Sequence, residues 1–231
     1  MGIRENIQEV REKVAEAARR AGRDPGAVNL VAVTKTIPLD SVMEAYHCGI
    51  RDFGENRVQE LLKKYGKIPP GVNLHFIGTL QTNKVKKIIG RADLIHSLDG
   101  MALAEEIDRA ARETGQAARV LIQVNIGSEG TKHGLPPKEV LPFAEQAAGL
   151  TGLQILGLMA IAPWCKDPED VRPYFREMNV LFKKVKERVP GLLMRHLSMG
   201  MSGDYPVAVE EGATILRVGT AIFGARNNTT T

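Results

Sequence analysis

Three short stretches of this 231-residue chain carry side chains that could do chemistry together. The first ends in Lys35, which follows the aliphatic and largely β-branched run at residues 30–33. A lysine amine condenses with an aldehyde when its neutral form is accessible, and apolar surroundings favour that form. On strand context alone, a solvated lysine just past a strand is the commoner case. Lys35 therefore becomes a candidate only if a partner site accompanies it.

The other two stretches combine glycine with hydroxyl residues. Residues 198–203 read Ser-Met-Gly-Met-Ser-Gly, and residues 217–220 read Arg-Val-Gly-Thr. Small residues let backbone N–H groups approach an anion, and each stretch precedes a predicted helix or turn, where negative charge is favoured. Ordinary glycine turns are the alternative. The hydroxyl groups and the paired location favour a phosphate site.

An amine and a phosphate cradle together suit one kind of ligand, an aldehyde that carries a phosphate group. Pyridoxal 5′-phosphate fits this description, because its aldehyde condenses with a lysine such as Lys35. A sugar phosphate, with Lys35 as the Schiff-base lysine of an aldolase, uses similar parts and remains the alternative.

The hydrophobic pattern predicts alternating strands and helices that would position these stretches. An amphipathic helix is expected over residues 1–22, ending at Gly22. Strands are predicted at residues 28–34, 50–53, 73–77, 94–97, 119–125, 153–161, 194–198 and 214–218. Helices are predicted between them at 40–48, 58–65, 83–89, 101–114, 137–148, 168–189 and 205–211, with a glycine-bearing loop at 127–134 and a polar tail at 225–231.

This alternation with about eight strands predicts a single domain over residues 1–231, a (β/α)8 TIM-type barrel. In such a barrel the working residues lie at the carboxyl ends of the strands. Little chain follows the eighth strand, so the N-terminal helix is expected to cover the gap there. An open doubly wound sheet is the runner-up, but residues 34–37 lack the glycine-rich turn that dinucleotide binding would need.

Composition and pattern argue against several function classes. The net charge is only +4, and few aromatic residues accompany the basic clusters at 63–67 and 84–87, so no nucleic-acid surface is expected. Two distant cysteines and five histidines without paired spacing predict neither a disulfide framework nor a metal site. No apolar run approaches membrane-spanning length and the first residues lack a signal-peptide core, so the expected location is the cytoplasm.

Five stretches, taken together and in this order, resemble the pyridoxal phosphate homeostasis protein family. They are residues 30–35 (LVAVTK), 53–60 (FGENRVQE), 75–84 (HFIGTLQTNK), 196–202 (HLSMGMS) and 217–224 (RVGTAIFG). Thr79 and Thr82 stand where the family often has serine. The resemblance implies a barrel like the N-terminal domain of alanine racemase and pyridoxal phosphate held as an internal aldimine. It also implies a role in vitamin B6 and amino-acid homeostasis without an established catalytic reaction.

The resemblance assigns roles to individual residues. Lys35 matches the aldimine lysine, and Arg217 matches the residue beside the pyridine nitrogen. Asn56 and His75 match positions that line the pocket, although a supporting or core histidine is an equal interpretation of His75. The phosphate-binding stretches are matched by Ser198, Met201, Ser202, Gly219 and Thr220.

These assignments favour a carrier or regulator of pyridoxal phosphate over an enzyme. A guanidinium only donates hydrogen bonds, so a pyridine nitrogen that faces Arg217 stays unprotonated and the ring is a weaker electron sink. Racemisation also needs a second acid/base group, and all four tyrosines fall in predicted helices rather than at strand ends. A racemase or decarboxylase of restricted scope is the alternative. The expected partners are pyridoxal phosphate and recipient apo enzymes, and the chain is expected to be a monomer.

Overall fold

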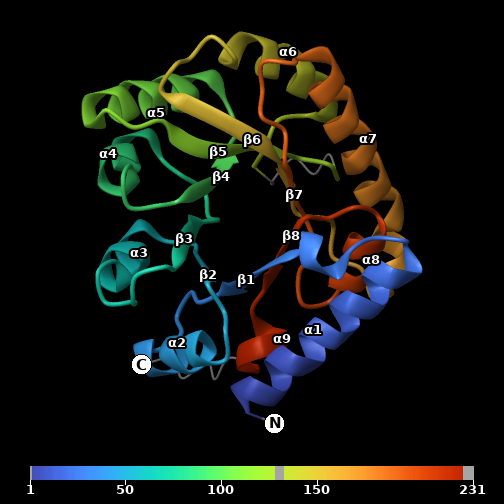
Figure 1. Cartoon of the computed structure of the whole chain (residues 1–231). Helices are drawn as coiled ribbons and strands as arrows, with labels where there is room; N and C mark the ends of the chain where they lie inside the picture. The colour runs from blue at the N-terminus through green and yellow to red at the C-terminus, as the bar shows by residue number, and fades with distance from the viewer. Residues whose placement is uncertain (1, 128–132, 226–231) are drawn as a thin grey trace.

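The strands of the computed structural model, which describes residues 2–127 and 133–225, close into a barrel (Figure 1). They follow one another around the barrel in chain order, every neighbouring pair is parallel, and β1 pairs with β8 to close the ring. The predicted (β/α)8 barrel is therefore confirmed. The strands are β1 (Asn29–Val33), β2 (Asp52–Glu55), β3 (Asn73–Phe76), β4 (Leu94–Leu98), β5 (Ala118–Val124), β6 (Leu153–Ala160), β7 (His196–Ser198) and β8 (Ile215–Val218).

Helices lie on the outside of the barrel and cover its strands (Figure 1). Their apolar stripes pack on the outward-facing strand residues, and this layer holds most of the buried apolar side chains. The α-helices are α1 (Ile3–Arg20), α2 (Leu39–His47), α3 (Val58–Lys64), α4 (Val85–Ile88), α5 (Met101–Thr114), α6 (Pro137–Ala147), α7 (Arg172–Arg188), α8 (Tyr205–Glu210) and α9 (Thr220–Phe223). Short 3-10 helices are η1 (Pro25–Ala27), η2 (Thr82–Lys84) and η3 (Pro168–Val171).

A smaller apolar cluster fills part of the barrel interior. Its members come from β1, β4, β5, β6 and β8 and are Val31, Leu94, Leu121, Leu156, Met159 and Ile215. Barrel interiors are usually filled by such branched apolar side chains in layers. Buried polar side chains from the strands lie in the barrel as well, namely His75, His96, Ser198 and Arg217.

Helix α1 covers the gap beside the eighth strand, as the sequence predicted. It packs against α8 and α9 (Figure 1). The buried side of α1 includes Ile7, Val10 and Val14. Asn6 Nδ2 donates a hydrogen bond of 2.8 Å to the backbone carbonyl of Ile222 in α9. The first helix and the last helix described are thus joined directly.

Two expected helices differ from the prediction at their starts. The helix expected at 83–89 begins as η2 and continues only as the four-residue α4. The helix expected at 168–189 begins as η3, where Asp167 caps the turn by accepting a hydrogen bond from Glu169 N. Pro173 then stands in the first turn of α7, where its missing N–H costs nothing. Residues 128–132 of the predicted loop and 226–231 of the predicted tail lie outside the described residues.

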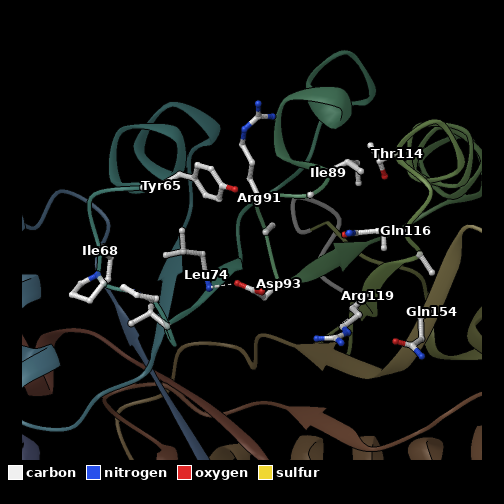
Figure 2. A pocket seen from close by; sticks show the side chains of 18 residues that line it. Tyr65, Ile68, Leu74, Ile89, Arg91, Asp93, Thr114, Gln116, Arg119 and Gln154 are labelled. Atoms are coloured by element: carbon white, nitrogen blue, oxygen red, sulfur yellow. Dashed lines mark hydrogen bonds between the residues drawn. The ribbon is translucent and has the colours of Figure 1, made fainter.

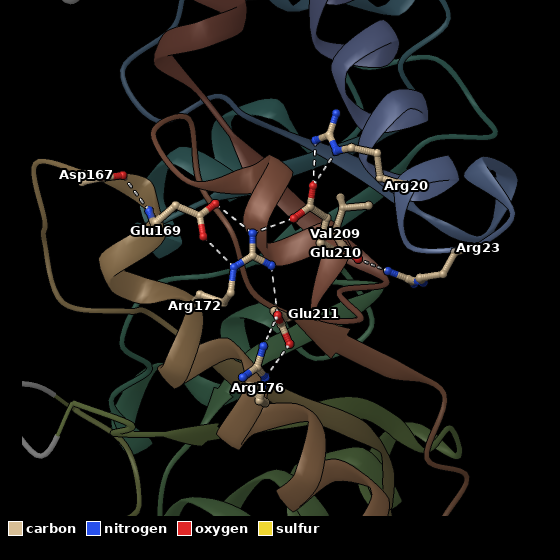
Figure 3. Close-up of polar contacts among 9 residues, drawn as sticks. All are labelled: Arg20, Arg23, Asp167, Glu169, Arg172, Arg176, Val209, Glu210 and Glu211. Atoms are coloured by element: carbon tan, nitrogen blue, oxygen red, sulfur yellow. Dashed lines mark hydrogen bonds and ion pairs between the residues drawn. The ribbon is translucent and has the colours of Figure 1, made fainter.

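An ion-pair network fastens α8 to its neighbours (Figure 3). Arg172 of α7 bonds Glu169 of η3 and also both carboxylates at the end of α8, Glu210 at 2.6 Å and Glu211 at 2.9 Å. Arg20 of α1 reaches the same Glu210 at 2.7 Å. Because α8 follows the glycine-bearing turn after β7, the network fixes the element that carries that turn.

No helix among residues 2–127 and 133–225 is both long and apolar enough to cross a membrane.

Candidate functional site

Lys35 lies two residues beyond the end of β1, at the carboxyl ends of the barrel strands. Its side chain is half-buried. The residue before it, Thr34, is fully buried and continues the strand pairing, since its N–H donates a hydrogen bond of 2.9 Å to Gly54 O of β2. This end of a (β/α)8 barrel is where ligand sites form.

A buried ion pair holds the backbone directly before Lys35. Lys64 Nζ, from the end of α3, donates to Glu55 Oε1 and to Thr34 O, each at 2.6 Å. Thr34 Oγ1 donates to the same Glu55 oxygen at 2.5 Å. Burial raises the pKa of Glu55 above its usual value, against the lowering effect of the hydrogen bonds from Lys64 and Thr34. The segment that presents Lys35 is therefore tied to β2 and α3.

Thr36, the residue after Lys35, has a strained backbone. Its φ is +63°, and it is the only non-glycine residue with positive φ within the part of the chain that the structure describes. A β-branched side chain rarely adopts this left-handed conformation. Its hydroxyl donates to Lys35 O at 2.6 Å and its N–H donates to Glu60 Oε2 at 3.3 Å, so these bonds offset part of the strain. Backbone strain of this kind gathers at ligand sites.

A chain of hydrogen bonds crosses the barrel interior from β8 to β2. Arg217 Nη1 donates to Ser198 Oγ at 2.6 Å, and that hydroxyl lies 3.0 Å from His96 Nδ1. His96 Nε2 lies 2.9 Å from His75 Nδ1, and His75 Nε2 lies 3.0 Å from Asp52 Oδ1. We call these five residues the interior chain. Its middle members are nearly excluded from solvent, with Ser198 and His96 both at 0% exposure.

Burial sets the charge states along the interior chain. It lowers the pKa of Arg217 to about 10, so the guanidinium is still charged at neutral pH. It also lowers the pKa of His96 well below the usual value, which keeps that ring neutral. Burial alone would raise the pKa of Asp52. The hydrogen bonds from His75 and Asn73 outweigh this effect, so the pKa of Asp52 lies below its ordinary value. A cation and a carboxylate thus stand at opposite ends.

The turns after β7 and β8 meet at the hydroxyl of Ser202. Ser202 Oγ accepts hydrogen bonds from the backbone N–H groups of Gly219 and Ala221, each at 3.2 Å. Gly200 in the first turn has a φ of +92°, and a Cβ there would lie 2.6 Å from Ala208 Cβ, so only glycine fits. Two N–H groups that converge on one oxygen are the arrangement that binds a phosphate oxygen.

A cavity of about 250 Å³ opens at the same end of the barrel, beside the strand ends of β2, β3, β5 and β6. Asn56, Thr79, Gln123 and His133 are among the residues that line it. Asn56 Oδ1 is buried and has no hydrogen-bond partner among the described residues. A buried polar atom without a partner is costly, so this amide oxygen is suited to a ligand that carries a donor.

A larger cavity, of about 870 Å³, lies at the opposite, amino-terminal ends of β3 to β6 (Figure 2). Two contacts join residues of its lining: Asp93 accepts a hydrogen bond from Leu74 N at 2.7 Å, and the Arg91 guanidinium lies over the Tyr65 ring. None of the residues predicted from the sequence to bind a ligand lines it. In (β/α)8 barrels this face serves stability rather than chemistry.

The predicted site residues divide into two groups in the structure. Lys35, Asn56, Met201, Ser202, Gly219 and Thr220 lie in segments that follow strand ends, at the mouth of the barrel. Arg217, Ser198 and His75 lie within strands, and their side chains form the interior chain. The hydroxyl of Ser198 is therefore engaged with Arg217 and His96, and His75 is 5% exposed and faces Asp52. Cofactor contact by any of the nine residues stays a prediction.

Sequence reasoning missed four residues that organise this site. They are Asp52, Glu55, Lys64 and His96. His96 had a signal, because it interrupts the apolar strand at 94–98. Glu55 lay inside a quoted motif without a role, and nothing in the sequence indicated that Lys64 turns inward while Lys63 beside it is exposed. No group of three or more His, Cys, Asp or Glu side chains that could hold a metal occurs within the described ranges.

Known proteins that resemble this chain cover almost all of it. The family model described as "Alanine racemase, N-terminal domain" matches residues 3–227. The pyridoxal phosphate homeostasis protein of Aquifex aeolicus is 45% identical over 227 residues, which are 98% of this chain and 99% of that protein. The protein of the same name from Escherichia coli is 39% identical, with 97% of each chain covered.

Solved structures agree with these sequence matches. PipY of Synechococcus elongatus with pyridoxal phosphate bound has a TM-score of 0.84 and 36% identity, covering 96% of this chain and all of that one. An alanine racemase of Streptomyces coelicolor has a TM-score of 0.72 at 21% identity, and the match covers 97% of this chain and 58% of the racemase, so it supports the fold alone. The chain belongs to the pyridoxal phosphate homeostasis protein family.

Proposed function

We propose that this chain binds pyridoxal 5′-phosphate through Lys35 and serves intracellular homeostasis of that cofactor as a carrier or regulator. Binding is covalent: the Lys35 amine adds to the aldehyde carbon of the cofactor, one water leaves, and a carbon–nitrogen double bond forms. The bound PipY relative, with 36% identity and a TM-score of 0.84, supports this choice of ligand.

The observation that carries the proposal is the set of groups at one end of the barrel. The cofactor has an aldehyde, a ring nitrogen and a phosphate group, and each has a matching feature here. Lys35 supplies the amine, Arg217 supplies a buried cation, and the N–H groups of Gly219 and Ala221 converge on the Ser202 hydroxyl. A phosphate oxygen would take the acceptor role that Ser202 Oγ now has, and Thr220 starts the helix at that point.

The other predicted residues have distinct tasks in this proposal. Asn56 offers its unpartnered oxygen to a donor on the ligand side of the 250 Å³ cavity. Met201 is partly exposed in the turn after β7 and its N–H is held by Asp204 Oδ1 at 2.6 Å, which fixes the turn. Ser198 and His75 act from the interior, through Arg217, rather than at the mouth.

Arg217 supports a binding role without a catalytic cycle. Its guanidinium has only donors and remains charged at neutral pH, so a ring nitrogen beside it accepts a hydrogen bond and stays unprotonated. An unprotonated ring withdraws electrons weakly from a bound amino acid. The four tyrosines lie at Tyr46 in α2, Tyr65 after α3, Tyr174 in α7 and Tyr205 in α8, all outside the barrel.

The binding proposal is tested by absorbance. Purified protein with added pyridoxal phosphate is expected to absorb at about 420 nm, where lysine Schiff bases of this cofactor absorb. Borohydride reduction followed by mass spectrometry is expected to place the modification on Lys35. Lys35→Ala should lose the band, whereas Lys63→Ala, which removes an exposed lysine of α3, should keep it. A band retained in Lys35→Ala, or no band in the wild type, would contradict the proposal.

The carrier role is tested by transfer. Protein loaded with the cofactor is mixed with an apo enzyme that depends on pyridoxal phosphate, and the recovery of that enzyme's activity is followed. The control is protein whose cofactor has first been fixed to Lys35 by borohydride reduction. Enzyme activity that recovers faster with the unreduced protein than with this control supports release to a recipient. No recovery at all would refute the carrier. Light scattering of the loaded protein checks the proposed monomer, with a mass near 25.2 kDa expected.

A second candidate, an enzyme of restricted scope, is favoured by one observation. His133 lines the 250 Å³ cavity, and its Nδ1 lies 3.8 Å from Asp99 Oδ2, so an acid/base group with a carboxylate partner faces the site. Incubation with each L-amino acid, with chirality and carbon dioxide followed, separates the candidates. Turnover that disappears in both Lys35→Ala and His133→Gln would establish the enzyme.

A further inference from the structure

The interior chain is unusual because it is polar where barrels are ordinarily apolar. The side chains of Val31, Leu121 and Ile215 fill the neighbouring part of the interior in the ordinary way. A buried polar network is costly unless every member has a partner, and then it rigidifies its members. The interior chain meets that condition, since each of its five side chains contacts the next within 3.0 Å.

The two ends of the chain impose a direction on the hydrogen bonds between them. Arg217 can only donate, and the Asp52 carboxylate can only accept. In the arrangement in which His75 accepts from His96, the donors then run from Arg217 to Ser198, from Ser198 to His96, from His96 to His75, and from His75 to Asp52. Each histidine carries its proton on Nε2 in this arrangement. The tautomers follow from the partners.

Further groups contact Asp52 and Arg217, the two end members of the interior chain. At the Asp52 end, Asn73 Nδ2 donates to Asp52 Oδ1 at 3.0 Å, and His196 of β7 lies close enough to interact with the same carboxylate. At the other end, Arg217 Nη2 donates to Ala160 O at 2.9 Å, and Asp204 lies near the guanidinium. The guanidinium is thus fixed on two sides, by the β6 backbone and by Ser198.

We propose that Asp52, His75 and His96 are positioning residues that hold Arg217, through the Ser198 hydroxyl, in the orientation in which it donates to the ring nitrogen of the cofactor. This inference rests on the proposed function. The task of the barrel interior is to orient the guanidinium of Arg217. Ser198 Oγ accepts a hydrogen bond from Nη1, and the Ala160 carbonyl accepts one from Nη2. The guanidinium is then held by its neighbours before any ligand arrives.

A purely structural network makes a different prediction. It would stabilise the fold, and its loss would weaken every ligand of the site to the same extent. A positioning role acts on the ring nitrogen alone. The two are separated by an analogue of pyridoxal phosphate in which a C–H group replaces the ring nitrogen, because that analogue keeps the aldehyde and the phosphate and cannot accept the bond from Arg217.

The variants are Asp52→Asn, which keeps an acceptor for His75 and removes the charge, and His96→Gln, which removes the central ring. Met159→Leu is the matched control, since it replaces a barrel-interior side chain that does not belong to the interior chain by one of similar volume. We expect pyridoxal phosphate to bind about threefold more weakly to Asp52→Asn and about tenfold more weakly to His96→Gln. The analogue should bind the wild type and both variants equally, and Met159→Leu should change neither ligand.

Ser198→Ala supplies a second check, because it removes the hydroxyl that joins His96 to Arg217 by hydrogen bonds. In that background, Asp52→Asn should have no additional effect on binding of the cofactor. An equal loss for the cofactor and the analogue, or an additive effect in the Ser198→Ala background, would overturn the positioning role. Asp52→Asn is the mildest change, so it decides the question if His96→Gln does not fold.

Nitrogen NMR of the ligand-free protein tests the interior chain independently of the cofactor. His75 and His96 are both expected to be protonated on Nε2, and a proton on Nδ1 of His96 at neutral pH would overturn the direction of the chain. If the wild type binds neither ligand, the proposed function and the positioning of Arg217 toward the cofactor are both refuted. The expected tautomers in the same protein would still establish the direction of the hydrogen bonds.

Discussion

Lys64 Nζ donates a hydrogen bond of 2.6 Å to the backbone carbonyl of Thr34, the residue directly before Lys35. A buried ammonium from one helix therefore fixes the backbone that presents the candidate cofactor lysine. The same ammonium pairs with Glu55, which is fully excluded from solvent. One of these two lysines is thus buried inside the fold, and the other stands at the mouth of the barrel.

Replacing Lys64 by Met should destabilise the protein by about 3 kcal/mol, because it leaves the buried Glu55 carboxylate without its partner. Urea unfolding measures the change, and Lys63→Met on the exposed face of α3 is the matched control, with a change under about 0.5 kcal/mol expected. The double variant Lys64→Met with Glu55→Gln should recover part of the loss. Equal effects of Lys64→Met and Lys63→Met would contradict the ion-pair argument.

Replacing Thr36 by Asn should stabilise the fold by about 1 kcal/mol, since Asn adopts a positive φ far more readily than a β-branched residue. The expected rise in Tm is about 2–4 °C, measured by calorimetry. Thr36→Val keeps the branched shape and removes the hydroxyl that bonds Lys35 O, so it should lower Tm. A Val variant more stable than the Asn variant would show that the strain is not in the backbone.

Stability should fall in acid because His96 is held neutral. The pKa of His96 is lowered by burial, so below about pH 6.5 the unfolded chain takes up a proton that the folded chain does not bind. The unfolding free energy should therefore decrease by up to about 1.4 kcal/mol per pH unit from this group as the pH falls.

The measurement is urea unfolding at several pH values between 5 and 8, compared with His96→Asn. The wild type should lose stability more steeply than the variant below pH 6.5, and the two should run parallel above it. His47→Asn, which replaces an exposed histidine of α2, should follow the wild type. Parallel curves for the wild type and His96→Asn throughout would refute the buried neutral state.

Gly157→Ala should prevent stable folding or destabilise the protein by more than about 3 kcal/mol. A Cβ at this position of β6 would lie 1.8 Å from the backbone oxygen of His196 in β7, a clash that only a shift of the strand pair can relieve. Gly191→Ala is the control, because nothing lies within 4 Å of its Cβ position. Circular dichroism and urea unfolding compare the two, and similar stabilities would contradict the close strand approach.

The barrel could be predicted from the sequence because its strands and helices have clear periods and short connections. Predicted bounds failed at two places. Asp167 caps η3 and Pro173 stands in the first turn of α7, so the start of one predicted helix is divided, and the strand predicted at 194–198 begins only at His196. Hydrophobic pattern alone does not report such side-chain bonds to the backbone.

The mouth of the site was also predictable, because strand ends in a barrel share one face and the glycine turns have recognisable composition. The interior chain was not. Its hydrogen bonds join residues on different strands, from 19 positions apart for Ser198 with Arg217 to 102 for His96 with Ser198, and depend on which strand residues face inward. In β4 and β6 the alternation of inward and outward residues also changes at a register shift, which no composition rule locates.

The pairing of β1 with β8 has a consequence for synthesis of the protein. Val31 is the register partner of Arg217, so the amine-bearing and guanidinium-bearing strands meet only when the ring closes. Before β8 joins the ring, Arg217 is absent from the mouth at which Lys35 stands, and long-range closure of this kind is slow. The candidate cofactor groups should therefore come together late, only once β8 has paired with β1.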